Sequence, residues 1–460
     1  MSRVAATVGI CLGSALVALI LSAVNTALPT IRSDLGATLV QIQWMVNIAA
    51  IARGSLVATL GRLSDMFGRR RLFIWGMASV LLGALVGGFA PNIGWLIVAM
   101  LIIGAASAAL LVATQALLSH LYPDNQMGRA MAFWSVALGV GIATGSLLSG
   151  SLLEVISWRW AFFSTIPFVL VALVLTWLAV AESRDEKREK RIDWVGLSLL
   201  IVGVGALVTA IIQGQVWGWG SAPTVTLFVV AVVAVGLFLW VETHIAYPLL
   251  RPKLFANRMF ISGAATNLCF ICFMLTTIFL TPLFLNFVLG ASPLQVGLLV
   301  AVLAVPVMLV GPLAGLLTER WGPKPQVLFG LAILAVGSVW MTTFSEETAL
   351  WQVALPLILY GIGWGTMQGS AATAAITSLP KELAGAASGG FVMMGGLGGA
   401  IGLAVAGTIV GSVYSEELGI EPSPAAFADG FHAGMWFLLG VSLFALLLVL
   451  VVMRNGRRGW

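Results

Sequence analysis

Residues 61–68 read Gly-Arg-Leu-Ser-Asp-Met-Phe-Gly, and residues 315–322 read Gly-Leu-Leu-Thr-Glu-Arg-Trp-Gly. Both octapeptides begin and end with glycine, place a hydroxyl residue before an acidic one, and place an aromatic residue before the last glycine. They lie 254 residues apart (315 minus 61), and each stands at the end of a long apolar stretch. The chain is therefore predicted to contain two copies of one membrane-embedded unit, with a binding site between the copies, as in secondary transporters.

The composition of the whole chain is that of a membrane protein. Hydrophobic residues make up 60% of the 460 residues and charged residues only 9%, and the mean hydropathy is +1.04. A soluble domain averages roughly 45–50% apolar and about 25% charged residues. A soluble enzyme, a disordered protein and a nucleic-acid binder are therefore excluded.

The expected fold class is an all-α polytopic membrane protein with 14 transmembrane helices, because 14 apolar stretches are long enough to span a bilayer. The two octapeptides are eight stretches apart, whereas two six-helix halves would be offset by six. The two additional stretches predict a pair of helices inserted between two six-helix bundles. The predicted parts are an N-terminal bundle over 1–181, a charged cytoplasmic linker over 182–193, the inserted pair over 194–241 and a C-terminal bundle over 242–460.

Basic residues predict the orientation in the membrane. With both termini in the cytoplasm, 20 of the 23 Lys and Arg residues fall on the cytoplasmic side. The exceptions are Arg32 and Arg159 outside and Arg53 within a span. The expected location is the cell inner (cytoplasmic) membrane. The net charge of +5 reflects this topology rather than nucleic-acid binding.

Several short motifs occur in a fixed order along nearly the whole chain. Together they resemble the major facilitator superfamily, and specifically its 14-span drug:proton antiporter branch. Besides Gly61–Arg71, they are Asn25-Thr-Ala-Leu-Pro29, Gln43-Trp44, Ser157-Trp-Arg-Trp-Ala-Phe162, Ile166-Pro167, Ile192-Asp-Trp-Val-Gly196, Pro248-Leu-Leu, Leu289-Gly-Ala-Ser-Pro-Leu-Gln-Val-Gly297 and Ala386-Ala-Ser-Gly-Gly390.

The resemblance implies a secondary active transporter that exports amphipathic small molecules by alternating access, a multidrug-type efflux protein without a cofactor. A dedicated exporter of one anionic or neutral metabolite or lipid is the alternative, with its coupling to protons left open. A polytopic membrane enzyme is a further alternative, although the histidines and carboxylates form no constellation in the sequence. The expected partners are a small amphipathic substrate and membrane lipids, with protons and a periplasmic adaptor left open and nucleic acid excluded.

Two positions depart from this branch of the superfamily. Its first span carries an aspartate where this chain has Ile20, and its fourth span carries an arginine where this chain has Met100. Both groups are usually tied to proton coupling. The substitutes that the sequence offers for proton coupling are Glu154 and His120, each near the end of a span.

Arg53 is the charged residue that the sequence places inside a span. It lies eight residues before Gly61, about 12 Å from the end of the helix at 1.5 Å per residue. A charge at that depth costs about 2.5–3.5 kcal/mol. One interpretation is a cation that faces the cavity and receives an anionic or neutral amphiphile; the other is an arginine that snorkels or binds backbone carbonyls.

Other polar or aromatic residues within spans are predicted to line the substrate cavity or to join helices by hydrogen bonds. They are Asn25, Asn47, Gln115, Trp134, Asn267, Asn286, Tyr360, Trp364 and Gln368. The two octapeptides are predicted to be conformational loops, in which glycines permit a tight turn and an acidic residue makes a contact that changes between states. Their key residues are Gly61, Asp65, Gly68, Arg69, Arg70, Gly315, Glu319 and Gly322. No metal site is expected, because Cys11, Cys269 and Cys272 lie in apolar stretches without further ligands nearby.

Overall fold

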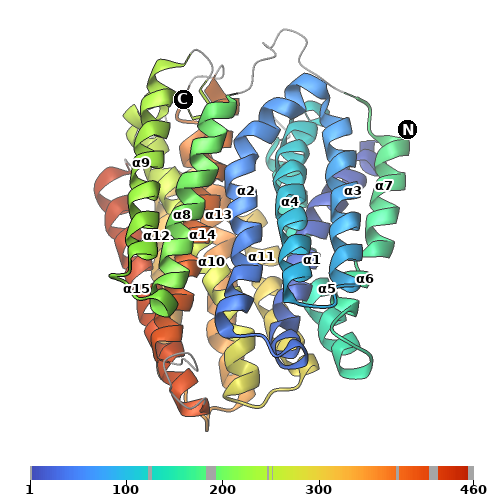
Figure 1. Cartoon of the computed structure of the whole chain (residues 1–460). Helices are drawn as coiled ribbons and strands as arrows, with labels where there is room; N and C mark the ends of the chain where they lie inside the picture. Colours follow the sequence, from blue (N-terminus) through green and yellow to red (C-terminus); the bar gives the residue numbers. More distant parts are fainter. Residues whose placement is uncertain are drawn as a thin grey trace.

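The chain folds into helices that run side by side through one bundle (Figure 1). The computed structural model describes residues 3–122, 127–182, 193–245, 248–250, 252–379, 383–413 and 423–453. Within these ranges 14 helices are long and apolar enough to cross a membrane, and no strand occurs. The all-α polytopic fold is therefore confirmed.

The helices fall into three consecutive groups along the chain. The first group is α1 (Arg3–Leu35), α2 (Leu39–Phe67), α3 (Arg69–Gly88), α4 (Ile93–Leu121), α5 (Met127–Val155), α6 (Trp160–Phe163) and α7 (Ile166–Ala179). The second group is the pair α8 (Trp194–Trp217) and α9 (Ala222–His244). The third group is η2 (Pro252–Ala256), α10 (Arg258–Phe287), α11 (Pro293–Trp321), α12 (Pro323–Met341), α13 (Leu350–Ile376), α14 (Ala384–Val413) and α15 (Pro424–Val452).

Both chain ends lie at one end of the bundle (Figure 1). We call this end the terminal face and the opposite end the distal face. The helix α2 begins at the distal face with a capping box formed by Thr38 and Gln41, and α11 begins there with the equivalent box of Ser292 and Gln295. The related octapeptides thus close two helices that also begin alike.

Two predicted spans differ from the observed helices. The apolar stretch over 159–181, one of the 14 expected to form a single span, folds as two helices, α6 and α7, interrupted at Ser164 and Thr165. Pro167 stands in the first turn of α7, where its missing N–H costs no helical hydrogen bond. The first apolar stretch covers residues 5–27, whereas the helix α1 that contains it continues to Leu35 with Pro29 inside it.

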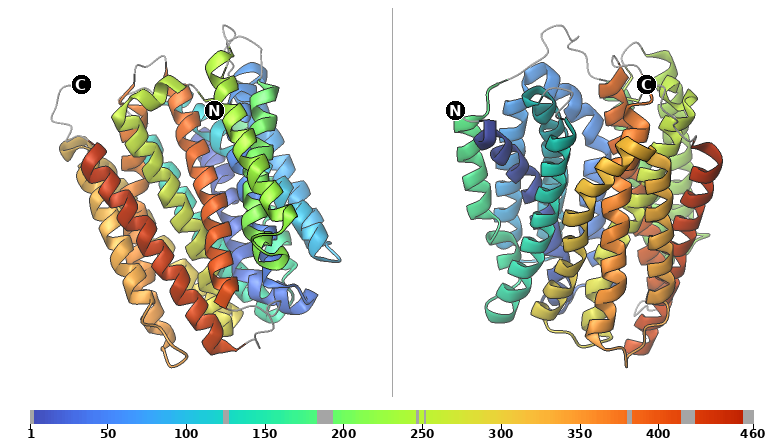
Figure 2. Two further views of the ribbon diagram at one scale, coloured as in Figure 1. Left: turned by 60° about the vertical axis from the view of Figure 1, so that its left-hand side comes forward. Right: turned by 180° about the vertical axis from the view of Figure 1, so that it is seen from behind.

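The first and third groups contact each other along two helix pairs, α5 with α11 and α2 with α14. Small residues allow the close approach. A Cβ on Gly54 of α2 would lie 2.9 Å from the carbonyl carbon of Gly396 on α14, and a Cβ on Gly150 of α5 would lie 3.2 Å from the Cα of Gly297 on α11. The pair α8 and α9 packs beside this junction, with α8 against α2 and α14 (Figure 2).

Candidate functional site

The candidate site lies where α2 of the first group meets α14 of the third. A Cβ on Gly104 of α4 would collide with the backbone of Ala49, and Gly54 faces Gly396, so this part of α2 is enclosed by α4 and α14. Arg53 stands one helical turn after Ala49 and next to Gly54. Residues i and i+4 share a helix face, so Arg53 lies on the side of α2 that Ala49 presents to α4, next to the contact of Gly54 with α14.

Arg53 occupies the midpoint of its helix. It is 14 residues from Leu39 and 14 from Phe67, about 21 Å from either end at 1.5 Å per residue. The residue is half-buried, and among the described residues none makes a hydrogen bond or ion pair with its side chain. A cation so deep in an apolar bundle, without a protein counter-charge, is electrostatically incomplete.

Two asparagines near the distal half of the bundle also carry unused hydrogen-bonding atoms. Asn47 of α2 is fully buried, and neither of its amide atoms has a partner. Asn25 of α1 donates to the carbonyl of Leu21 at 2.6 Å, while its Oδ1 is buried without a partner. Buried polar atoms are nearly always hydrogen-bonded in proteins, so these two side chains, which lack partners for those atoms among the described residues, have hydrogen-bonding capacity left for a ligand.

Two tryptophans show the same feature on other helices. Trp134 of α5 and Trp364 of α13 are almost fully buried, and their indole N–H groups have no acceptor. The Trp364 ring packs edge-on against Phe270 with centroids 6.0 Å apart. Gln368, one turn further along α13, is half-buried. An unsatisfied indole N–H beside an apolar ring suits an amphipathic ligand.

The remaining predicted cavity residues join parts of the protein to each other. Asn267 of α10 donates to the Phe391 carbonyl of α14 at 2.7 Å, and Asn286 donates to the Ala291 carbonyl at 3.2 Å. Gln115 of α4 accepts a hydrogen bond from Ser388 of α14 at 3.0 Å. Asn267 and Gln115 therefore fit the second interpretation given above, helix-to-helix hydrogen bonding, whereas Asn286 binds the loop directly after its own helix.

Tyr360 likewise lies within the third group of helices. Its side chain is fully buried. Its hydroxyl lies 3.2 Å from the hydroxyl of Ser338 on α12 and 3.8 Å from the sulfur of Met435 on α15. Its ring packs edge-on against Phe273 at 4.8 Å. The structure thus places Tyr360 away from the α2–α14 junction. Among the described residues, no hydrogen bond joins any two of the predicted cavity residues.

The two groups also touch at both faces of the bundle. At the terminal face the contact is the hydrogen bond between Gln115 and Ser388. At the distal face the Arg32 guanidinium of α1 lies 4.8 Å from the centroid of the Phe287 ring of α10. The sequence analysis did not single out Arg32 as functional, because it reads as an ordinary charge at a helix end.

The first octapeptide ends in a sharp turn that only glycine adopts readily. Gly68 has φ 114° and ψ 134°, and its amide donates to the Ser64 carbonyl at the end of α2. The next helix is capped by a distant acid, because Glu182 accepts hydrogen bonds from the amides of Arg70 and Arg71 at 3.1 and 3.2 Å. The Arg70 guanidinium in turn donates to the Trp177 carbonyl at 2.7 Å.

The predicted acidic residue of that loop, Asp65, has a side chain outside the described part of the structure, as does His120. Gly61 is half-buried on α2, and Arg69 follows Gly68 at the start of α3. Within the described residues, the acid that caps α3 is Glu182, the first residue of the segment predicted to be a charged linker. A carboxylate this far along the chain has no local signal that would pair it with residues 70 and 71.

The second octapeptide has a simpler environment. Gly315 and Glu319 are exposed, and Gly322 ends α11 with φ 81° and ψ 171°. Glu319 makes no ion pair within the described residues. The Lys324 ammonium donates to the Leu450 carbonyl of α15 at 3.0 Å.

The two positions at which the resembled branch carries ionisable residues for proton coupling hold apolar side chains in this chain. Ile20 and Met100 are both fully buried within the main hydrophobic core. Glu154 is exposed near the end of α5 and belongs to no hydrogen bond or ion pair within the described residues. Its placement at the distal rim gives it no contact with the α2–α14 junction.

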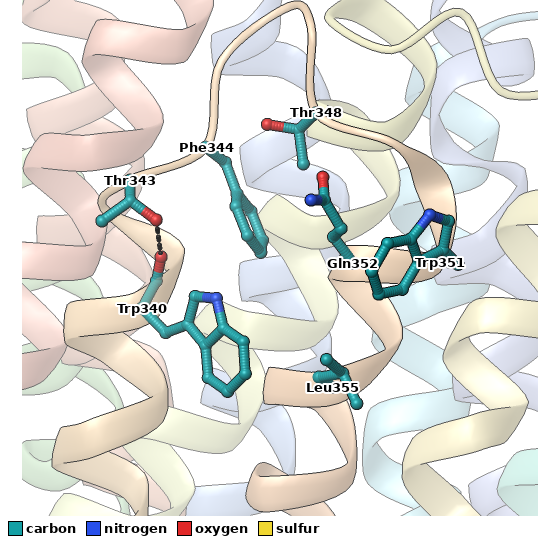
Figure 3. A pocket seen from close by; sticks show the side chains of 7 residues that line it. All are labelled: Trp340, Thr343, Phe344, Thr348, Trp351, Gln352 and Leu355. Carbon is teal, nitrogen blue, oxygen red and sulfur yellow. Dashed lines mark hydrogen bonds between the residues drawn. The ribbon is translucent and has the colours of Figure 1, made fainter.

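A pocket of about 180 Å³ opens at the distal face between the end of α12 and the start of α13 (Figure 3). Its aromatic walls are Trp340, Phe344 and Trp351, and the Thr343 hydroxyl points back to the Trp340 carbonyl at 2.7 Å. It contains none of the predicted site residues. Tryptophans at a bundle end are typical of the membrane–water boundary, so we assign this pocket to the aromatic belt.

Comparisons with known proteins agree with this architecture. The profile of the Major Facilitator Superfamily matches residues 10–403 and again residues 263–459. The multidrug resistance protein Stp of Mycobacterium tuberculosis is 34% identical over 397 residues, covering 86% of this chain and 73% of Stp. The puromycin resistance protein pur8 of Streptomyces alboniger is 31% identical over 440 residues, covering 93% and 86%. The multidrug export protein EmrB of Haemophilus influenzae is 30% identical over 382 residues, covering 82% and 74%. The chain is therefore a multi-pass membrane protein that belongs to the Major Facilitator Superfamily of transporters.

Proposed function

We propose that this protein is an efflux transporter that exports amphipathic small molecules by alternating access. Relatives that cover most of the chain are named for drug resistance or export. The two helix groups meet along α2–α14 and α5–α11, and among the described residues the predicted cavity residues Asn25, Asn47, Trp134 and Trp364 carry buried polar atoms without a hydrogen-bond partner. Such atoms suit a substrate that moves between the groups rather than a permanently dry core.

The proposed domain boundaries follow the three groups of helices. Residues 1–181 form the N-terminal bundle, 242–460 the C-terminal bundle, and 194–241 the inserted pair, with 182–193 as a linker. We infer that the terminal face is cytoplasmic and that the protein lies in the inner membrane. The support is the set of basic residues at that end, which includes Arg62, Arg70, Arg258, Arg320 and Lys324.

The observation that carries the proposed substrate class is the Arg53 guanidinium at the midpoint of α2, which has no hydrogen bond or ion pair within the described residues. An embedded cation without a protein counter-charge repels a cationic drug and attracts an anion. Export of anionic or neutral amphiphiles is therefore favoured over export of quaternary ammonium compounds. A dedicated exporter of one anionic or neutral metabolite or lipid is the narrower form of this proposal.

Susceptibility and retention assays in a bacterial host without its own pumps test the substrate class. The wild type, Arg53→Ala and Arg53→Lys are compared on matched cationic, neutral and anionic amphiphiles. Loss of one hydrogen bond to a charged group costs about 1.5–3 kcal/mol, so export of the anionic compound by Arg53→Ala should fall about 10- to 100-fold, with partial rescue in Arg53→Lys. The exposed residue Arg258 provides the matched control, Arg258→Ala. If the wild type exports the cationic compound and Arg53→Ala exports it equally well, the inference from the charge of Arg53 is wrong.

Protons are the proposed counter-ion, on the strength of the resemblance to the 14-span branch. Because Ile20 and Met100 fill the usual coupling positions, the protonatable group must lie elsewhere in this chain. Proteoliposomes with an imposed pH gradient test this point. Accumulation of substrate that follows the gradient supports proton exchange, and accumulation that ignores it favours the exporter that is not proton-driven.

A further inference from the structure

The pocket at the distal face, between the end of α12 and the start of α13, lies apart from the residues of the proposed substrate path. Its volume of about 180 Å³ is smaller than the roughly 300–1,000 Å³ of pockets for drug-sized ligands, so it suits a small chemical group. Trp340 and Trp351 stand on opposite sides of it, with Phe344 between them (Figure 3). Three aromatic rings thus form most of its walls.

The inner wall of the pocket is held in place by neighbouring helices. Phe344 is buried, and its ring stacks on Phe284 of α10 with centroids 6.2 Å apart. Phe284 stacks in turn on Phe431 of α15 at 4.2 Å. His432, the next residue of α15, donates from Nε2 to the Phe344 carbonyl at 2.6 Å. The pocket is therefore preformed, which lowers the entropic cost of binding a ligand.

The loop that joins α12 to α13 above the pocket is acidic. Residues 342–349 contain Glu346 and Glu347 and no basic residue, and both glutamates are exposed. The loop is ordered by its own hydrogen bonds, since the Ser345 amide donates to the Thr348 hydroxyl at 2.8 Å. Neither glutamate makes an ion pair within the described residues. Aromatic rings beneath an acidic loop favour a cationic group.

The surroundings of the pocket indicate that this cationic group belongs to a lipid. Tryptophans at the end of a bundle lie at the level of the lipid headgroups. Val336, one turn before Trp340, and Leu355, one turn after Trp351, are also exposed, so apolar surface continues from the pocket along both helices. Gln352 adds a hydrogen-bond donor. Its Oε1 accepts a backbone amide at 2.9 Å, while its Nε2 has no partner within the described residues.

We propose that this pocket binds the zwitterionic headgroup of a membrane phospholipid. The ammonium group lies against the rings of Trp340 and Trp351, below the acidic loop. Gln352 Nε2 donates to a phosphate oxygen, and the acyl chains follow the exposed apolar surface of α12 and α13 into the bilayer. A lipid bound in this way links the distal ends of the two helices, independently of the transported substrate.

Native mass spectrometry of the purified full-length protein tests the headgroup preference. The protein is offered phosphatidylethanolamine, which carries an ammonium group, and phosphatidylglycerol, which does not, in equal amounts and with the same acyl chains. The wild type should retain phosphatidylethanolamine preferentially. Trp340→Leu and Trp351→Leu should each reduce this retention about 2- to 5-fold, the effect of one cation–π contact at an exposed site. Trp95→Leu, which removes an exposed tryptophan near the start of α4, is the matched control and should leave retention unchanged.

Hydrogen exchange in nanodiscs gives a second measurement, which locates the site. Amides of residues 343–352 should exchange more slowly in the presence of phosphatidylethanolamine than in phosphatidylglycerol alone. The double variant Glu346→Gln with Glu347→Gln should lose part of this protection. Equal protection of the same amides by tetramethylammonium chloride would show that the site takes a free ammonium ion, and would overturn the assignment to a lipid.

Two results of the mass spectrometry would also overturn the proposal. One is equal retention of the two lipids by the wild type. The other is a loss in Trp95→Leu as large as that in Trp340→Leu, because the effect would then belong to any exposed tryptophan. Neither measurement follows transport, so failure here is distinct from failure of the efflux proposal.

Discussion

The two octapeptides obey one sequence pattern yet lie in different surroundings. The loop at 61–68 is tied to distant parts of the chain, through Glu182 to the start of α3 and through Arg62 to Pro248. In the loop at 315–322 the acid of the pattern, Glu319, makes no ion pair within the described residues, and Lys324 just after the loop donates to the end of α15. A duplicated motif therefore fixes the turn in both halves, while the contacts that the turn makes are set by what lies beside it.

The largest expected effect comes from the glycines that end the two loops. Gly68→Ala and Gly322→Ala each force a side chain into a backbone region reserved for glycine, which costs about 1–3 kcal/mol. A Cβ on Gly68 would also lie 2.9 Å from Glu182 Oε2 and displace the acid that caps α3. Gly68→Ala should therefore lower the melting temperature of the purified protein more than Gly322→Ala does. Equal losses would show that Glu182 adds nothing to the first loop.

The capping acid gives an intermediate effect with a matched control. Glu182→Gln weakens two amide contacts and the interaction with the N-terminus of α3, which should reduce the free energy of unfolding by about 1 kcal/mol. The same exchange at the exposed residue, Glu319→Gln, should stay within about 0.5 kcal/mol. Thermal unfolding of both variants at low and high salt checks the difference, which should shrink as salt screens the charge. If Glu319→Gln lowers the free energy of unfolding as much as Glu182→Gln does, the two loops do not differ in how strongly their acids stabilise the fold.

The smallest effect is expected at the second loop. Lys324→Gln removes a single exposed hydrogen bond to the Leu450 carbonyl, and such surface contacts are worth about 0–1 kcal/mol. The melting temperature should stay close to that of the wild type. A drop comparable to that of Glu182→Gln would indicate that the second loop is anchored as firmly as the first.

Local sequence was sufficient to predict the elements that depend on neighbouring residues. Long apolar runs predicted the 14 spans, and glycines 68 and 322 predicted the turns, because hydropathy and backbone freedom are properties of a few consecutive residues. The interruption between α6 and α7 was missed, because the stretch stays apolar across Ser164 and Thr165 and hydropathy alone does not register a break in helical geometry.

The candidate site was predictable only in part. Arg53 was evident as a charge within an apolar stretch, because an embedded charge is costly and therefore rare. Asn267 and Tyr360 looked equally polar in the sequence. Their hydrogen bonds to Phe391 and Ser338 appear only once α10 lies against α14 and α12 against α13. Residue type identifies a polar atom in a span, but only packing decides whether the protein itself satisfies it.

By itself, the sequence determined that this chain spans a membrane many times and carries one octapeptide pattern twice, and it predicted that one cation, Arg53, lies within a span. The tertiary structure decided which distant groups meet. Arg62 and Pro248 are 186 residues apart, and Glu182 caps amides more than 100 residues before it. Contacts of this kind depend on how whole helices pack, through small residues such as Gly54 and Gly396. No local pattern encodes them, because each partner reads as an ordinary charged or backbone group until the other is brought beside it.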